Sequence, residues 1–236
     1  MSERKFDSSY RESLTLRDGG EVELRLVQRE DRELLERGFE KLSDRSRYLR
    51  FFTAKPHLTA AEVSYLTDVD GETHFAIGAS RRGASGVEEG VAVARFIRLP
   101  VEPEVAEAAV TVLDEMQGKG LGSVLLLRLI AAARERGVRA FRCWLLAENR
   151  DMQALIHEWL PGAHERLEGA ELVIDAPLPE VGPAEPTSTR PVDHPLYRML
   201  RHAASGAVTV LGLGRWIPGA HPAPETDPPA SRSGEG

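Results

Sequence analysis

The spacing of hydrophobic and polar positions changes repeatedly along the first three quarters of the chain, which predicts a domain of mixed strands and helices. Residues 21–27 alternate polar and apolar side chains as a half-buried strand does, whereas residues 30–42 repeat apolar side chains at helical spacing. Apolar side chains in residues 48–52 indicate a second helical region. The string LTAAEVSYLT predicts a third helix, because Thr59 is a favourable N-cap and Glu62 occupies the capping-box position.

The later elements predict a meander followed by a crossover. Three apolar stretches separated by short turns predict consecutive antiparallel strands over residues 74–80, 90–98 and 105–113. The remaining pattern predicts a helix over 120–136, a strand over 140–146, a helix over 150–160 and a strand over 171–175. This order predicts an α/β (α+β) domain with a mixed, mostly antiparallel central sheet flanked by helices.

The distribution of proline predicts where the folded domain ends. Eleven of the fifteen prolines fall within residues 177–236. We therefore expect one domain over residues 14–176, followed by a proline-rich linker, a short amphipathic helix and a disordered tail. The helix is predicted over residues 194–204, where it either docks on the domain or contacts a partner or a membrane surface.

Composition and charge narrow the class of protein. The 236 residues are 42% hydrophobic and 28% charged, a balance typical of a soluble globular protein. We expect a cytoplasmic location, because the chain shows neither a spanning apolar run nor a secretory signal. A net charge of −7 argues against nucleic-acid binding and suits cationic partners. A single cysteine and the lack of paired histidine ligands predict no metal site.

The most informative segment is VTVLDEMQGKGLGS, residues 110–123, where a predicted strand runs through a glycine-rich turn into the long helix. Glycines let a ligand approach the backbone, and the free amides and dipole of a helix N-terminus favour an anion such as a diphosphate. Lys119 adds a positive charge there. The alternative is a tight turn that needs glycine only for packing. Neither a Walker sequence nor the G-x-G-x-x-G spacing of a dinucleotide fold is present.

What remains in this segment is the string Q-x-x-G-x-G, formed by Gln117, Gly120 and Gly122. It resembles the acetyl-CoA motif of the GNAT superfamily of N-acetyltransferases. The order of elements over residues 14–176 is similar to a complete GNAT domain, and the strings SDRSRYLRFF, LTAAEVSYLTDVD and WLLAENRDM resemble bacterial protein-lysine acetyltransferases. The resemblance implies a GNAT-like fold, acetyl-CoA as cosubstrate, and acetyl transfer to a primary amine on a protein lysine or a small molecule.

The resemblance also implies which residues bind the donor. Backbone amides of the turn would hold the CoA diphosphate, and Ser123 would close the turn; the contributing residues are Gln117, Gly118, Lys119, Gly120, Leu121 and Gly122. Val112 would bind the pantetheine arm through its backbone, because a bulge in its strand would part that strand from its neighbour. Asn149 matches the family asparagine that contacts the same arm.

Glu107 is the candidate general base. It lies five residues before Val112, about 16 Å along an extended strand, which is comparable with the reach of a pantetheine arm. The matching position carries a glutamate in the lysine-acetyltransferase subgroup. The surrounding alanines would lower the local polarity and raise the pKa of the Glu107 carboxyl group. The alternative is an ordinary glutamate on the solvent side of a strand.

The chain departs from the family at one position. Many members carry a tyrosine seven residues after the asparagine, where it protonates the leaving thiolate, but here that position is Ile156. His157 is displaced by about 100° around a helix, so we expect solvent or no dedicated acid. Cys143 is expected to be a small buried hydrophobic residue rather than a nucleophile.

Arg45, Arg47 and Arg50, with Tyr48, form a predicted helix face that either lies near the acceptor entrance in the family's layout or is ordinary solvated charge. The leading hypothesis is an acetyl-CoA-dependent N-acetyltransferase that uses direct transfer, with Glu107 as base. A non-catalytic acyl-CoA-binding regulatory module is the second hypothesis. An unrelated anion-binding α/β domain is the third.

Overall fold

The computed structural model describes residues 4–147, 153, 156, 160, 162–168 and 171–179. Its strands are β1 (Arg11–Thr15), β2 (Glu21–Leu26), β3 (His74–Arg82), β4 (Glu88–Leu99), β5 (Glu102–Val112), β6 (Ala140–Leu146), β7 (His164–Glu168) and β8 (Glu171–Pro177). They form a single sheet of order β1-β2-β3-β4-β5-β6-β8-β7. All neighbouring strands are antiparallel except β5 and β6, which are parallel.

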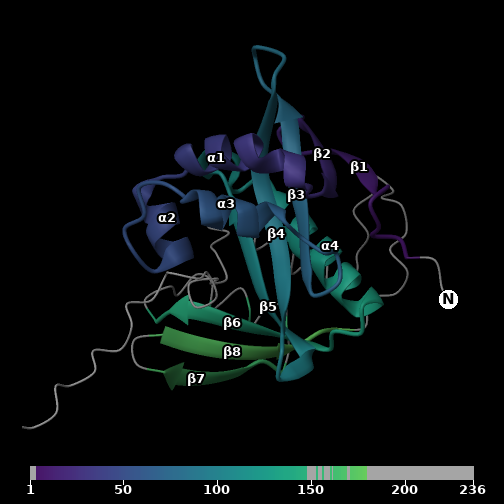
Figure 1. Cartoon of the computed structure of the whole chain (residues 1–236), viewed down its shortest axis with the longest axis vertical. Helices are drawn as coiled ribbons and strands as arrows, with labels where there is room; N and C mark the ends of the chain where they lie inside the picture. The colour runs from purple at the N-terminus through teal and green to yellow at the C-terminus, as the bar shows by residue number, and fades with distance from the viewer. Residues whose placement is uncertain are drawn as a thin grey trace, which may run out of the picture.

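Helices cover both faces of the sheet (Figure 1). The α-helices are α1 (Arg32–Glu40), α2 (Asp44–Phe51), α3 (Ala60–Thr67) and α4 (Leu121–Glu135), and single 3₁₀ turns, η1 (Arg29–Asp31) and η2 (Asp114–Met116), precede α1 and α4. Helices α1 to α3 lie on one face, and α4 lies on the other. None of these helices is both long and apolar enough to cross a membrane.

The face of the sheet toward α4 is a packed aromatic and aliphatic core. Phe75 and Phe96 stack with ring centroids 5.3 Å apart, and Phe141 lies 6.4 Å from Phe96. Leu125 and Leu129 of α4 are fully buried. Because side chains alternate across a strand, the even-numbered residues of β5 belong to this core, and odd-numbered residues such as Glu107 belong to the face toward α1.

The predicted fold class is confirmed, and several elements match closely. The predicted strand over residues 140–146 is β6, and the predicted third helix is α3, which begins after Thr59. The Thr59 side chain accepts a hydrogen bond from the N–H of Glu62, and the Glu62 carboxylate accepts one from the N–H of Thr59. These two bonds form the capping box that the sequence predicted.

Two edge strands were not predicted, β1 and β7. Every residue of β7 is exposed, so its side chains carry no alternation that marks a strand. The predicted helix over residues 150–160 lies outside the described residues apart from Gln153 and Ile156, which are helical, and Leu160. The predicted segment 194–204 lies entirely outside them.

Candidate active site

The sheet opens between β5 and β6. The two strands pair only where residues 105–107 meet residues 140–142, and no pairing continues toward Val112 and Leu146. Figure 1 shows the strands diverging beyond this point. The gap therefore exposes one edge of β5 while the other edge remains paired with β4.

The direction of hydrogen bonds along β5 identifies which backbone groups face this gap. Leu113 donates its N–H to the carbonyl of Val91 in β4, while Glu104 accepts from Arg139 on the β6 side. Backbone groups of successive residues point to opposite neighbours in a sheet, so Ala108, Val110 and Val112 direct theirs into the gap. The expected position of Val112 is thereby supported by its strand geometry.

The expected bulge in the strand at Val112 does not account for the opening. The register between β4 and β5 is continuous from Ala106 to Val112, and its only shift in this ladder lies at the opposite end, next to Leu99. The bulge expected in the strand at Val112 is therefore absent. Pairing between β5 and β6 stops at Glu107, and the two strands part beyond this residue.

Two glycines of the turn adopt backbone angles that favour glycine. Gly118 and Gly120 have positive φ angles, 73° and 90°, which glycine adopts without strain. Gly120 is the N-cap of α4, and no side chain caps the helix. The first amides of α4 are consequently available to an anion, and the hydroxyl oxygen of Ser123 is buried without a partner among the described residues.

Three side chains hold or charge this turn. Gln117 donates its side-chain N–H to the carbonyl of Val112 at 3.2 Å, and Lys119 forms a 2.8 Å ion pair with Asp18. Arg17, from the turn between β1 and β2, places its Nε 3.7 Å from the position that a Cβ on Gly120 would occupy. Arg17 carries no signal in the sequence, because only the pairing of β1 with β2 brings it to the turn.

Glu107 is buried on the face of the sheet toward α1. Only 1% of the residue is exposed, and its Oε1 has no hydrogen-bond partner among the described residues. Burial raises the pKa of Glu107 to about 8, and the positive charge of Arg50 partly opposes this rise. The predicted direction of the pKa shift is confirmed, and the alternative of a solvent-facing glutamate is wrong.

Arg50 of α2 is the charged group that acts most on Glu107. It is 4% exposed, and its Nη1 atom is buried without a partner among the described residues. Burial lowers the pKa of Arg50 to about 10, and the interaction with Glu107 opposes this. The site thus contains a cation and a carboxyl group that interact through space, and neither Nη1 of Arg50 nor Oε1 of Glu107 has a hydrogen-bond partner among the described residues.

The other members of the predicted helix face behave differently from Arg50. Arg47 donates to the carbonyl oxygens of Pro56 and Glu40 and lies over the ring of Phe39. Arg45 is exposed, as solvated charge is. Of the members of this predicted face, Arg50 is the one that interacts with Glu107.

The other residues that the sequence singled out are Cys143, Asn149, Ile156 and His157. Cys143 is 1% exposed, and burial raises the pKa of its thiol, so it is the small buried residue that was predicted. Ile156 is also buried. Asn149 and His157 lie outside the described residues. Within the described part of the chain, no group of three or more His, Cys, Asp or Glu side chains is arranged to hold a metal ion.

The fold and the site together define an acetyltransferase, with an open strand edge beside a glycine turn at an uncapped helix N-terminus and a buried carboxyl group. The model of the acetyltransferase (GNAT) family matches residues 33–160, more than half of the chain. The chain belongs to the GNAT family of acetyltransferases, whose members use an acyl-CoA cosubstrate.

Its relatives are acetyltransferases. The chain is 33% identical over 150 residues to acetyltransferase Pat of Mycolicibacterium smegmatis, covering 62% of this chain and 43% of that protein. It is 33% identical over 141 residues to acetyltransferase PA5475 of Pseudomonas aeruginosa, covering 60% of this chain and 75% of that protein. The chain therefore spans less than half of the length of the first of these relatives.

Among solved structures, the GNAT domain of S. lividans PAT is 30% identical. The similarity covers 73% of this chain and 99% of that domain, with a TM-score of 0.64.

Proposed function

We propose that this chain is an acetyl-CoA-dependent N-acetyltransferase that acetylates a primary amine, with Glu107 as general base. The observation that carries the proposal is the burial of Glu107, whose carboxyl group is 1% exposed and has a pKa of about 8. A carboxyl group with this pKa is partly ionised near neutral pH and accepts a proton more readily than an ordinary glutamate does.

The donor occupies the gap between β5 and β6 and the turn at α4. The pantetheine arm lies along β5 and hydrogen-bonds the backbone of Val112, and the diphosphate accepts hydrogen bonds from the amides of residues 118–122, which Ser123 follows. The N–H of Gln117 instead donates to the carbonyl oxygen of Asp114. Asn149 contacts the same arm. The open β5 edge and the uncapped N-terminus of α4 support this placement.

The reaction is a direct transfer. Glu107 takes a proton from the incoming ammonium, directly or through a water, and the neutral amine then attacks the thioester carbonyl carbon. Backbone N–H groups of β5 that face the gap polarise the carbonyl oxygen as negative charge develops on it. The C–S bond breaks, the nitrogen releases its second proton to solvent, and the CoA thiolate receives a proton from solvent, because Ile156 replaces the family tyrosine.

The acceptor is a protein lysine or a small amine. The net charge of −7 suits a cationic acceptor of either kind. The string SDRSRYLRFF, which resembles bacterial protein-lysine acetyltransferases, favours the protein lysine.

The test is Glu107→Gln, which keeps the shape of the side chain and removes the base. We expect kcat to fall by about 10²-fold or more while the Kd of acetyl-CoA, measured by calorimetry, stays the same. Glu104→Gln is the matched control, since Glu104 lies on the same strand but is exposed. Unchanged kcat in Glu107→Gln would remove this residue from the mechanism. Binding of acetyl-CoA without turnover of any amine would favour the non-catalytic regulatory module.

A further inference from the structure

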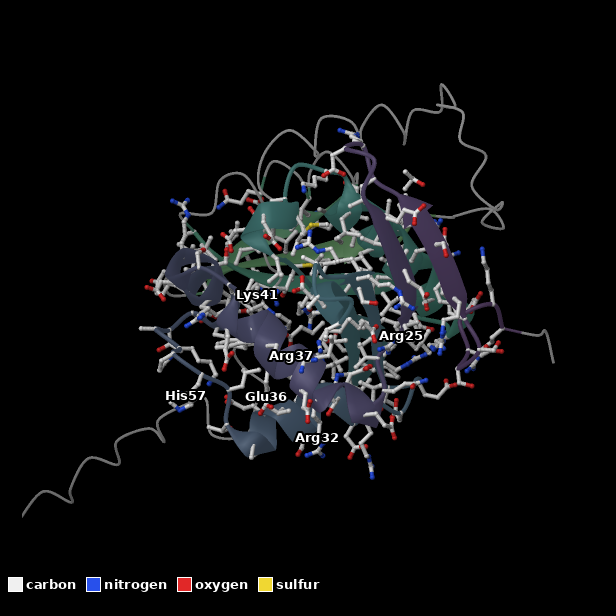
Figure 2. The ribbon with its side chains drawn as sticks, turned by 90° about the horizontal axis from the view of Figure 1, so that it is seen from above. Arg25, Arg32, Glu36, Arg37, Lys41 and His57 are labelled. Atoms are coloured by element: carbon white, nitrogen blue, oxygen red, sulfur yellow. The ribbon has the colours of Figure 1, made fainter. Side chains whose placement is uncertain are left out.

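A cavity of about 110 Å³ lies beneath α1, between this helix and the sheet. Its walls are mostly apolar and are formed by side chains including Leu34, Leu35, Phe39, Leu42 and Val93. Figure 2 looks down on the helix that roofs it, with Arg32, Glu36, Arg37 and Lys41 along α1 and Arg25 beside it. A volume of this size accommodates several water-sized groups, hence a ligand with a short chain.

The arginine side chains that line the cavity differ in whether a carboxylate neutralises them. Arg25 donates two hydrogen bonds to Asp31, at 2.7 and 2.6 Å, so this pair is neutral overall. Arg50 and Arg95 also line the cavity, and they are only 4% and 2% exposed. Neither forms an ion pair with a carboxylate in the part of the chain that the structure describes.

The hydrogen-bond partners of Arg95 compensate its positive charge only in part. Its Nη1 donates to the carbonyl oxygen of Leu66 at 3.0 Å and lies 3.1 Å from Nε2 of His74. Burial lowers the pKa of His74 to about 3, so the ring is neutral and accepts this hydrogen bond. The partners of Arg95 are therefore neutral dipoles, and the like charge of Arg50 adds to burial in lowering the pKa of Arg95 to about 9.

Two buried guanidinium groups without an acidic partner are expensive to maintain. Breaking up a buried ion pair by removing one partner is strongly destabilising, because an uncompensated charge remains. Glu107 interacts with Arg50, but burial keeps much of this carboxyl group protonated near neutral pH, and it does not line the cavity. An anion inside the cavity would supply the missing charge, and the apolar wall would receive an attached chain.

We propose that the cavity beneath α1 binds a carboxylate on a short apolar chain, with the carboxylate on Arg50 and Arg95 and the chain against α1. The same chemistry has two sources, a free short-chain acid or the distal carboxylate of a dicarboxylic acyl group carried on CoA. The first source is independent of the proposed function, whereas the second rests on it.

The free-acid source is tested on the full chain by calorimetry and thermal unfolding with hexanoate, hexanol and hexylamine. We expect saturable binding and a rise in Tm with hexanoate only, because the alcohol and the amine lack the anion. The CoA-linked source is tested by comparing the Kd of glutaryl-CoA with that of pentanoyl-CoA, which has the same chain length without the distal carboxylate. A preference for the carboxylate in either comparison supports the site and identifies its source.

Two kinds of variant make the assignment specific. Arg50→Met removes the charge and should weaken carboxylate binding about tenfold or more. Gly78→Ala and Gly78→Val keep Arg50 and narrow the cavity, which Gly78 lines; a Cβ there meets only ordinary contacts of 3.5 Å and beyond. Arg166→Met, on exposed β7, is the control for loss of a positive charge.

Binding that falls in Arg50→Met, and progressively from Gly78→Ala to Gly78→Val, supports the proposal. The proposal is overturned if neither comparison shows a preference for the carboxylate, or if the preference survives in both Arg50→Met and Gly78→Val. Failure of acetyl-CoA to bind would defeat the proposed function but would leave the hexanoate result interpretable.

Discussion

The side-chain amide of Gln117 donates a hydrogen bond to the backbone carbonyl oxygen of Val112 at 3.2 Å. Val112 faces the gap between β5 and β6, so the bond joins the glycine turn to the open edge of the strand. The two parts of the proposed donor site, which are five residues apart in the sequence, are thereby held in one arrangement. The side chain of Gln117 therefore has a structural role, because it connects the glycine turn to β5.

Gln117→Ala should weaken the donor site without affecting the chemical step. Loss of one hydrogen bond costs about 1 kcal/mol, which corresponds to a rise in the KM of acetyl-CoA of about fivefold. Steady-state kinetics with varied acetyl-CoA measure this, and kcat should change little. Glu115→Gln, which removes an exposed charge two residues earlier, is the control. An unchanged KM would show that the bond does not order the turn.

The ion pair between Lys119 and Asp18 leads to a second prediction. Asp18 competes with the CoA diphosphate for Lys119, so Asp18→Asn should lower the KM of acetyl-CoA by about twofold to threefold at low ionic strength. Arg17→Gln should raise it, because this guanidinium lies beside Gly120. The differences should shrink in added salt, which screens exposed charges.

Glu36→Gln on α1 controls for the change in net charge that Asp18→Asn introduces. Equal effects of these two substitutions on the KM of acetyl-CoA would contradict a local role for Asp18.

Local sequence signals were sufficient for those elements whose cause is local. The capping box of Thr59 and Glu62 marks the start of α3, and Gly120 with its positive φ marks the start of α4. The edge strands β1 and β7 have no such signal. The only half-buried apolar side chain of β1 is Leu14, and every residue of β7 is exposed, so pairing with a neighbour defines both as strands.

The candidate site shows the same division between local and distant causes. The glycine turn is contiguous in sequence, and its motif identifies it. The interaction of Arg50 with Glu107 joins α2 to β5, and the proximity of Arg17 to Gly120 joins a hairpin turn to α4. No spacing within the chain encodes such contacts, because they depend on how the elements pack against the sheet.

Asp114 connects α2 to the segment before the glycine turn. Its carboxylate accepts hydrogen bonds from the N–H and hydroxyl of Ser43 and from the hydroxyl of Ser46, at 2.8 to 3.0 Å. Asp114→Ala should lower the free energy of unfolding by about 1 kcal/mol, a value kept small because the group is partly solvated. Urea denaturation measures this difference. Asp44→Ala, which removes an exposed acid of α2, is the control.

The pH dependence of this difference follows from the pKa of Asp114. Burial raises the pKa and the hydrogen bonds from Ser43 and Ser46 lower it, with a net lowering from 3.8. A lowered pKa in the folded state contributes stability above the unfolded pKa, and this contribution is lost as the pH falls through the folded value. The difference between the native protein and Asp114→Ala should therefore be present at pH 7 and narrow below about pH 4. A difference of the same size at pH 7 and below about pH 4 would contradict the assignment of this pH dependence to the Asp114 carboxylate.

The raised pKa of Glu107 predicts the pH profile of acetyl transfer. A base works in its ionised form, so kcat/KM should rise with pH and level off above a pKa of about 8. Arg50→Met should move this rise to higher pH, because the positive charge that favours the carboxylate is lost while burial, the larger cause of the shift, remains. Arg45→Met, on the exposed side of the same helix, should leave the profile unchanged. The ionisation of the amine itself adds a rise at higher pH, and only this second rise should survive in Glu107→Gln. Persistence of the first rise in that variant, or an unshifted profile in Arg50→Met, would assign the titration to another group.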